Sequence, residues 1–177
     1  MTVFINLYGG PGAGKSTAAA FLFAEMKKMS KNVELVTEVA KDFVWEERNK
    51  TLEIQPYITV KQYRNLYRLK GKVDFVITDS PILLGCVYAE LYANDLPRSY
   101  KDMIVDLHRE VLNHRIDIFL ERTHAYDSNG RYQTEQQAIQ IDEMIKKWLR
   151  NTGEYVMTTS NYLDFQFLTD NFPETVT

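Results

Sequence analysis

The sequence predicts an α/β fold in which a five-stranded parallel sheet is covered by helices on both faces. Five short segments rich in apolar and β-branched residues recur along the 177 residues, and stretches of helix-forming composition separate them. Strands that alternate with helices pair in parallel, because each crossover helix packs on a face of the sheet. No repeat, low-complexity tract or linker-like segment interrupts this order, which predicts a single domain over residues 1–177.

The expected elements follow one another along the whole chain. Strands are predicted over residues 3–8, 33–37, 73–78, 116–121 and 154–158. Helices are predicted over residues 17–28, 55–70, 81–93, 99–113, 134–150 and 160–170. Pro173 is expected to end the last helical pattern.

Two of the expected helices carry more detailed signals. In the 55–70 helix, apolar residues recur at helical spacing at Val60, Tyr63, Leu66 and Tyr67. At the start of the 134–150 helix, Thr134 and Gln137 have the spacing of a capping box. The inward stripe of that helix is predicted at Ala138, Ile141, Ile145 and Trp148.

The composition of the chain indicates in which cellular compartment the protein is expected. Hydrophobic residues (45%) and charged residues (25%) occur in the proportions of a soluble globular protein, and the net charge of −3 gives no overall attraction to nucleic acid. The single cysteine, Cys86, excludes an internal disulfide, and its apolar neighbours indicate a core residue rather than a nucleophile. No signal-peptide pattern and no run near the roughly 18 apolar residues that span a bilayer are present. We therefore expect a cytoplasmic protein without a membrane partner.

Residues 9–16 read Gly-Gly-Pro-Gly-Ala-Gly-Lys-Ser and match the phosphate-binding pattern G-x-x-x-x-G-K-[ST]. The segment lies between an expected strand and an expected helix, so the helix N-terminus points at the phosphates. Lys15 is predicted to reach the β- and γ-phosphates, and Ser16 to place its hydroxyl on Mg²⁺. The predicted nucleotide-binding residues are Gly9, Gly10, Pro11, Gly12, Ala13, Gly14, Lys15, Ser16 and Thr17. The fold class is therefore a three-layer P-loop NTPase domain that uses ATP and Mg²⁺.

Two acidic residues follow expected strands and should face the glycine loop. Ligands of open parallel sheets lie beyond the carboxyl ends of the strands, where Glu38 ends the second strand and Asp79 the third. Asp79 is predicted to hold Mg²⁺ with Ser16, and its alternative role is an N-cap of the next helix. Glu38 is predicted to orient an acceptor hydroxyl and take its proton, as a general base does. Asp42, one turn later, competes for this role but is expected to be a solvated side chain.

A polar segment over residues 122–134 follows the fourth strand and is predicted to form a lid. Arg131, at a glycine turn, is the first candidate to neutralise the transferring phosphoryl group, and Arg122 is the second. Both arginines would instead be surface residues if the segment is an ordinary loop. The histidine in the segment, His124, is interpreted as a surface residue, and no metal-site spacing links the three histidines to Cys86.

Residues 38–72 are rich in aromatic and basic side chains and are predicted to recognise the acceptor. A base could stack on tyrosine or tryptophan while an amide bonds its edge and an arginine meets a phosphate. The candidate residues are Gln62, Tyr63, Arg64 and Arg68. Aromatic residues at helical spacing belong to the core more often than to a ligand site, and this is expected for at least half of Phe43, Trp45, Tyr57, Tyr63 and Tyr67.

These motifs together resemble the family of small P-loop kinases that includes the ribosylnicotinamide kinase domain of NadR. The match comprises residues 7–17, the segment Thr-Glu-Val-Ala-Lys at 37–41, Ile-Thr-Asp-Ser-Pro at 77–81 and Gly-Arg-Tyr-Gln-Thr-Glu at 130–135. Compact members encoded by bacteriophages are especially similar, which would place the protein in the host cytoplasm. The resemblance implies the sheet order 2-3-1-4-5 and transfer of the γ-phosphoryl of ATP to a nucleoside, nucleotide or similar hydroxyl compound. By the same analogy Glu38 stands at the acceptor-side acid of nucleoside kinases. The adenylyltransferase domain of NadR has no counterpart in this sequence.

Three functions remain open at this level. The first is a kinase acting on a small nucleoside or nucleotide. The second is a kinase acting on 5-hydroxymethyl pyrimidines in DNA, with a basic strip as the DNA contact: Arg48, Lys61, Arg64, Arg68, Lys70 and Lys72. The third is an ATPase or switch that works through a protein partner; the missing Asn-Lys-x-Asp motif disfavours a GTPase, and Thr-Asp-Ser after the third strand disfavours a remodelling ATPase. The sequence leaves open the acceptor, the oligomeric state and the preferred donor nucleotide.

Overall fold

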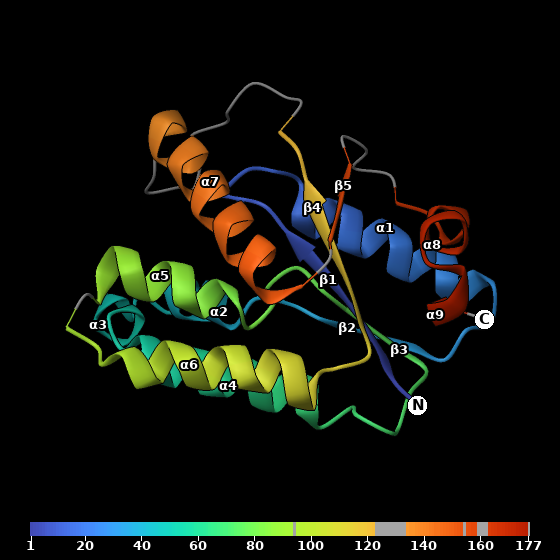
Figure 1. Ribbon diagram of the computed structural model, residues 1–177, viewed down its shortest axis with the longest axis horizontal. Helices are drawn as coiled ribbons and strands as arrows, with labels where there is room; N and C mark the ends of the chain where they lie inside the picture. The colour runs from blue at the N-terminus through green and yellow to red at the C-terminus, as the bar shows by residue number, and fades with distance from the viewer. Residues whose placement is uncertain (94, 123–133, 154, 159–162, 177) are drawn as a thin grey trace.

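The computed structural model describes residues 1–93, 95–122, 134–153, 155–158 and 163–176. Its sheet has five parallel strands in the order β2-β3-β1-β4-β5, as the sequence and the family resemblance predicted (Figure 1). The strands are β1 (Val3–Tyr8), β2 (Val33–Val36), β3 (Phe75–Thr78), β4 (Arg115–Leu120) and β5 (Val156–Thr158). Each predicted strand is therefore present, with its bounds shifted by two residues or fewer.

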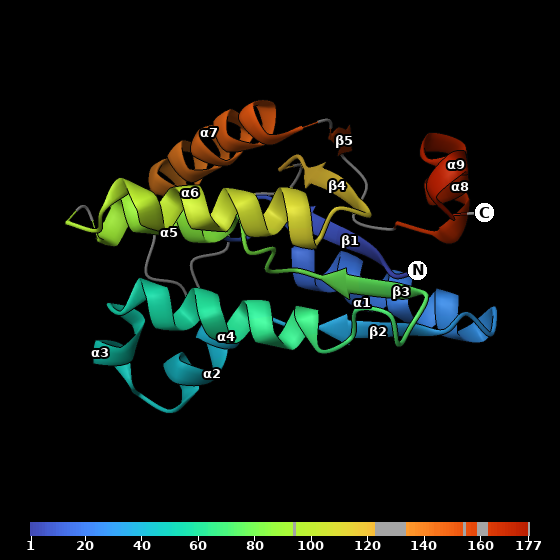
Figure 2. The same ribbon diagram turned by 60° about the horizontal axis from the view of Figure 1, so that its bottom comes forward.

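Helices cover both faces of this sheet (Figures 1 and 2). One face packs against α1 (Lys15–Lys28), α8 (Phe165–Asn171) and α9 (Pro173–Val176). The other packs against α4 (Gln55–Tyr67), α5 (Leu84–Tyr92), α6 (Arg98–Asp106), the π-helical turn η1 (Leu107–Val111) and α7 (Glu135–Thr152). Two short helices, α2 (Val39–Trp45) and α3 (Asn49–Leu52), lie beside α4. The three layers of the predicted fold class are confirmed.

The central strands are buried on both faces, which explains their continuous apolar sequences. In β1, Val3, Ile5 and Leu7 belong to the core beneath α1, whereas Phe4 and Tyr8 belong to the clusters under the opposite helices. All six residues of β1 are buried, because a central strand of a doubly covered sheet has no solvent face. At the edge, β5 exposes Met157 and is only partly buried on either side.

A buried polar cluster lies at the middle of the sheet. The carboxylate of Asp117 in β4 accepts hydrogen bonds from Asn6 (2.8 Å) and Arg115 (3.0 Å), and His108 in η1 lies 3.2 Å away. Burial alone would raise the pKa of Asp117, but hydrogen bonds from His108 and Asn6 and the charge of Arg115 lower it. The cluster links η1 to β1 and β4. Its strand residues lie within the strands and not at the carboxyl ends, where a ligand would bind.

Several helix predictions are confirmed and others are wrong. The capping box of α7 is present, with the Thr134 hydroxyl accepting from Gln137 N and the Gln137 side chain accepting from Thr134 N. Pro173 begins α9 instead of only ending a pattern, because proline at a first helical position lacks an N–H that would have no partner there. Cys86 is buried in the core, as expected, and burial raises its pKa to about 12.

Only part of the apolar pattern of α4 faces the core, where Leu66 is buried and Tyr63 is half-buried. Val60 and Tyr67 are exposed, and the buried positions are Gln55, Thr59, Gln62 and Leu66. Polar side chains occupy the inner face because they meet polar partners there: Thr59 bonds Tyr100 of α6 at 2.7 Å, and Gln62 bonds the backbone of α2. Hydrophobic periodicity alone could not predict that polar residues of α4 are buried, because hydrogen bonds take the place of apolar contacts on this face.

We predict that Gly85→Ala destabilises the protein. A Cβ at Gly85 of α5 would lie 2.5 Å from the Thr59 hydroxyl and 3.1 Å from Ile104, so α4, α5 and α6 pack too closely to admit it. Alanine normally stabilises a helix interior by roughly 0.5–1 kcal/mol relative to glycine, whereas overpacking costs about 1–3 kcal/mol. We expect a net fall in the free energy of unfolding and a Tm lower by roughly 2–4 °C per kcal/mol. Thermal unfolding checks this, and a variant as stable as the wild type would contradict such close packing.

Candidate active site

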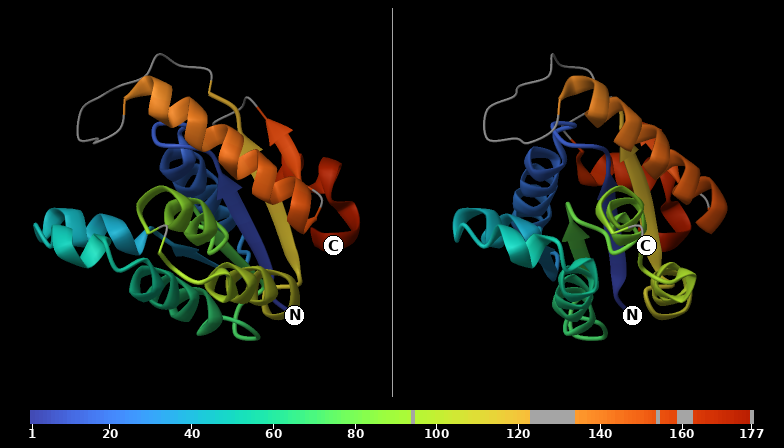
Figure 3. Two further views of the ribbon diagram at one scale, coloured as in Figure 1. Left: turned by 60° about the vertical axis from the view of Figure 1, so that its left-hand side comes forward. Right: turned by 90° about the vertical axis from the view of Figure 1, so that its left-hand side faces the viewer.

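Four strands end at one edge of the sheet, and each is followed by a residue predicted from sequence. β1 leads into the glycine loop, β2 into Glu38, β3 into Asp79 and β4 into Arg122. Figure 3 shows these parallel strands running toward the end of the molecule where α1 begins. Parallel pairing therefore brings together residues that are more than a hundred positions apart in sequence.

The glycine loop turns tightly because two of its residues have left-handed backbone angles. Gly12 has φ +80° and Gly14 has φ +87°, values that side chains with a Cβ rarely adopt. Gly14 immediately precedes α1, whose first residue is Lys15, so the N-terminus of α1 faces the loop. The free N–H groups and the helix dipole of this end favour an anion such as phosphate.

Lys15 is held by the loop and surrounded by carboxylates. Its Nζ donates hydrogen bonds to the carbonyl oxygens of Gly9 (2.7 Å) and Gly10 (3.1 Å). Burial lowers the pKa of Lys15, and the charges of Glu38, Asp79 and Asp142 oppose this shift. The ammonium group is thus fixed at the loop within the electrostatic reach of three acids.

Ser16 and Asp79 form a pair that fits a magnesium ion. The Ser16 hydroxyl donates to Oδ2 of Asp79 at 2.6 Å, and Oδ1 of this nearly buried carboxylate accepts no hydrogen bond from the described residues. Mg²⁺ prefers oxygen ligands and usually takes one or two from protein side chains and the rest from phosphates and water. Among the described residues no cluster of three His, Cys, Asp or Glu side chains could hold a metal by itself. Because α5 begins five residues later, at Leu84, Asp79 is not its N-cap.

Glu38 lies next to Lys15 and Asp79, where a group acting on an acceptor would be needed. It is half-buried at the start of α2, and burial together with the charge of Asp79 raises its pKa, although Lys15 opposes the shift. Behind it, Gln62 of α4 accepts a hydrogen bond from the backbone N–H of Val39 at 3.1 Å. Asp42 is exposed, as expected for a solvated residue.

Arg122 lies against the glycine loop and pairs with an acid that sequence analysis missed. Its Nη1 donates to the carbonyl of Pro11 (2.8 Å), and its Nη2 donates to Oδ2 of Asp142 (3.1 Å). Oδ1 of Asp142 accepts from the backbone N–H of Gly10 at 2.5 Å. One signal could have identified Asp142: it is four residues after Ala138 and three before Ile145, so a carboxylate interrupts the inward stripe of α7.

An aromatic pair on α5 was also missed. Tyr88 is half-buried, and its ring stacks on that of Tyr92 with centroids 6.2 Å apart. Burial raises the pKa of Tyr88, and the charges of Glu38 and Asp142 raise it further. The i, i+4 spacing of the two tyrosines in a mostly apolar helix was the available signal.

The predicted acceptor residues on α4 do not gather at the loop. Gln62 is buried with its amide oxygen bonded to α2, and Tyr63 stacks on Tyr67 and packs toward the core. Arg64 and Arg68 are exposed. Phe43 is buried and Tyr63 is half-buried, whereas Trp45, Tyr57 and Tyr67 are exposed, so the expectation that at least half of these aromatics form core is wrong.

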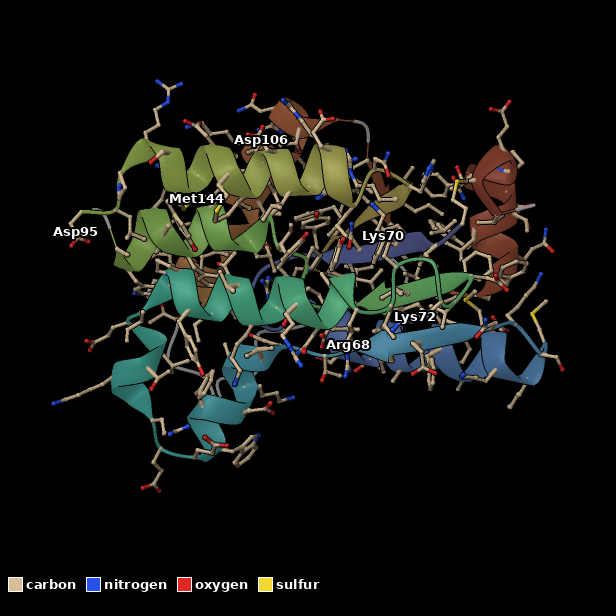
Figure 4. The ribbon with its side chains drawn as sticks, turned by 90° about the horizontal axis from the view of Figure 1, so that it is seen from below. Arg68, Lys70, Lys72, Asp95, Asp106 and Met144 are labelled. Carbon is tan, nitrogen blue, oxygen red and sulfur yellow. The ribbon has the colours of Figure 1, made fainter. Side chains whose placement is uncertain are left out.

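The residues of the predicted basic strip come from several elements: Arg48 precedes α3, Lys61 and Arg64 lie within α4, and Arg68, Lys70 and Lys72 follow its last residue. Lys61 lies over the rings of Phe43 (4.8 Å) and Tyr57 (5.4 Å). Figure 4 places Arg68, Lys70 and Lys72 around the end of α4 and the turn before β3. This turn bonds Thr2, just before β1 starts, so it lies at the opposite edge of the sheet from the glycine loop. The DNA hypothesis stays a prediction that this arrangement does not favour.

Two predicted residues lie outside the described residues. Arg131 and His124 both fall in 123–133, so the predicted lid and the first candidate for phosphoryl neutralisation stay predictions. In the described part of the chain, no helix is long and apolar enough to cross a membrane.

Comparisons with known proteins agree with this geometry. A profile of the AAA domain family matches residues 4–162, and no curated protein matches the sequence. The NadR protein, solved in complex with NR, superposes on 99% of this chain with a TM-score of 0.67 and 18% identity, and this chain spans only 52% of the NadR chain. The M. mycoides deoxyadenosine kinase superposes with a TM-score of 0.56 and 15% identity when bound to dCMP and dCDP, and 0.52 and 17% when bound to dATP. Both of these comparisons cover 97% of each chain.

At such low identity these neighbours establish the fold and not the substrate. The matched profile covers most of the chain, including the glycine loop, Glu38, Asp79 and the segment of α7 that carries Asp142. The chain therefore belongs to the AAA domain family, with the P-loop kinase fold that NadR and deoxyadenosine kinase share.

Proposed function

We propose that this protein is a kinase that transfers the γ-phosphoryl group of ATP, with Mg²⁺, to a hydroxyl or phosphate of a nucleoside or nucleotide. The observation that carries the proposal is the position of Glu38 after β2, Asp79 after β3 and the glycine loop with Lys15 after β1, at the carboxyl ends of three neighbouring parallel strands. A module that only binds nucleotide needs the loop, the lysine and a metal-holding acid, and has no need for a second, half-buried acid. Hydrolysis also uses such an acid, to position water, so the dependence of ADP release on an acceptor distinguishes a kinase from an ATPase.

The donor side is assigned to the loop and α1. Loop N–H groups and Lys15 bind the β- and γ-phosphates, and the α1 N-terminus favours their negative charge. Ser16 and Asp79 would hold Mg²⁺, which when bound neutralises charge on the β- and γ-phosphate oxygens. Arg122, beside Pro11 of the loop, is assigned a supporting positive charge.

The acceptor side is assigned to Glu38. Its carboxylate accepts a hydrogen bond from the acceptor hydroxyl and aligns the oxygen with the γ-phosphorus. As the new O–P bond forms, the bond from the γ-phosphorus to the β–γ bridging oxygen breaks, ADP leaves, and the hydroxyl proton passes to Glu38. The raised pKa of Glu38 suits a group that must take up a proton during the reaction.

An aromatic acceptor fits the neighbouring surface. Tyr88 stacks on Tyr92 of α5, and its pKa is raised by the charge of Glu38, so this aromatic pair is the proposed contact for a planar base. The structural neighbours support the same substrate class, since NadR was solved with NR and deoxyadenosine kinase with deoxynucleotides.

The proposal predicts that ADP formation depends on an acceptor. The purified protein with Mg²⁺ and ATP should release ADP at least tenfold faster with one member of a panel of ribonucleosides, deoxynucleosides, their monophosphates and nicotinamide riboside than without any. Lys15→Ala protein is the blank. An ADP release rate that no small acceptor changes would contradict the kinase assignment and favour an ATPase or switch module.

A further inference from the structure

A single carboxylate connects α7, the start of the glycine loop and the end of β4. Asp142 belongs to the inward stripe of α7 and is buried, with only 11% of its side chain exposed. Its two oxygens have different partners: Oδ1 accepts from Gly10 N (2.5 Å), and Oδ2 accepts from Arg122 Nη2 (3.1 Å). Arg122 then donates to the Pro11 carbonyl at 2.8 Å, which closes a ring of contacts around the loop.

Gly10 is the residue through which Asp142 affects Lys15. The N–H of Gly10 bonds Asp142, whereas its carbonyl accepts from Lys15 Nζ (3.1 Å) and from Ala13 N (3.2 Å). Gly10 thus donates its N–H to the carboxylate of Asp142, and its carbonyl accepts from the ammonium group of Lys15, the proposed phosphate-binding group. A shift of Gly10 would move the acceptors that fix Lys15.

The space around Gly10 shows how closely α7 approaches the loop. A Cβ at Gly10 would lie 2.7 Å from Asp142 Oδ1 and 2.8 Å from the Ala138 carbonyl. The backbone of Gly10 does not have a positive φ, unlike that of Gly9, Gly12 and Gly14. Glycine is therefore required at this position by the approach of α7 and not by the backbone angles.

We propose that Asp142 is a positioning residue that holds the first half of the glycine loop against α7, so that Lys15 is aligned for the nucleotide before it binds. The inference rests on the proposed function only in that the loop binds Mg·ATP. The charge of Asp142 is balanced by Arg122, which lets the carboxylate stay buried while it accepts the Gly10 N–H. Preorganisation of this kind increases affinity because the loop need not be ordered by the ligand.

The test is the dissociation constant of Mg·ATP, measured by calorimetry without any acceptor. Asn in Asp142→Asn can still accept the Gly10 N–H, but its NH₂ group then faces the Arg122 guanidinium, donor against donor. We expect Asp142→Asn to bind Mg·ATP at least tenfold more weakly than the wild type. The matched control is Glu143→Gln, which removes the same charge from the next residue, an exposed partner of Lys146, and should bind as the wild type does.

A second control separates positioning from stability. Ile145→Val removes one buried methyl group one turn along α7, which should lower Tm and leave the affinity for Mg·ATP unchanged. Gly10→Ala should weaken binding as Asp142→Asn does, because its Cβ displaces the loop from α7. An unchanged affinity in Asp142→Asn, or an equal loss of affinity in Ile145→Val, would overturn the inference.

The outcomes also separate this inference from the kinase proposal. If the wild type binds Mg·ATP, the Asp142→Asn affinity falls and no acceptor is phosphorylated, then the positioning role stands and the kinase proposal fails. If phosphoryl transfer to an acceptor occurs and the Asp142→Asn variant binds Mg·ATP as the wild type does, the kinase proposal stands and the positioning role fails. A wild-type protein that binds no Mg·ATP would overturn both.

Discussion

Lys15→Ala is expected to lower kcat/KM for ATP by roughly 10²–10³-fold, the loss that follows removal of one preorganised donor from a transition state. The ammonium group donates hydrogen bonds to Gly9 and Gly10 and is proposed to meet the β- and γ-phosphates, so its removal should leave charge on the transferring group without a partner. Burial lowers the pKa of Lys15, so its positive charge is maintained at a cost to the folded state. The variant should therefore fold normally while losing activity.

Steady-state kinetics with ATP as the varied substrate, together with thermal unfolding, checks this prediction. Lys28→Ala is the control, because Lys28 is an exposed lysine in the last turn of the same helix. Activity within a few fold of the wild type in Lys15→Ala would show that this loop does not serve the reaction.

Glu38→Gln is expected to lower kcat by roughly 10²–10⁴-fold, the usual contribution of a general base, while nucleotide binding persists. Because the pKa of Glu38 is raised, wild-type kcat should rise with pH through this pKa as the base loses its proton. Glu46→Gln, at the exposed end of α2, provides the control. Kinetics and Mg·ATP calorimetry check the prediction, and near-normal turnover in Glu38→Gln would remove Glu38 from the mechanism.

The same variant should be at least as stable as the wild type near pH 7. A carboxyl with a raised pKa in the folded state binds its proton more tightly there than in the unfolded chain, so the contribution of Glu38 to the free energy of unfolding is highest at low pH. It falls as pH rises from the ordinary value of 4.5 through the folded pKa, because the fold must then hold a poorly solvated charge. Glutamine never carries this charge. Tm measured against pH should show a variant advantage above this window and none below pH 4.5.

The sequence predicted the sheet and the residues at its carboxyl edge because both follow from local rules. Strand segments are read from apolar runs, and the residues after Tyr8, Val36, Thr78 and Leu120 meet at one edge in any parallel arrangement. The glycine loop could be recognised from the spacing of its own residues, because this spacing depends only on the backbone of the loop. These features needed no knowledge of how the helices pack.

Features that depend on packing between distant elements were not predictable. Asp142 contacts Gly10 across 132 positions, and although its place in the inward stripe of α7 marks it as a buried carboxylate, no local pattern identifies the backbone N–H that it bonds. The apolar pattern of α4 did not predict the whole of its buried face, because Thr59 and Gln62 are buried there with hydrogen-bond partners on α6 and α2. The basic strip was read as continuous along the sequence, yet Lys61 lies over the rings of Phe43 and Tyr57, whereas Lys72 lies in the turn before β3.

A single turnover with γ-labelled ATP tests the central claim most directly. Enzyme in excess over labelled Mg·ATP would be mixed with the nucleoside and nucleotide panel, and with DNA containing 5-hydroxymethyl pyrimidines in a separate arm, using Glu38→Gln and Lys15→Ala as blanks. The account predicts label on one small nucleoside or nucleotide, at a rate that Glu38→Gln strongly reduces. Label recovered only as inorganic phosphate, or only on DNA, would contradict it.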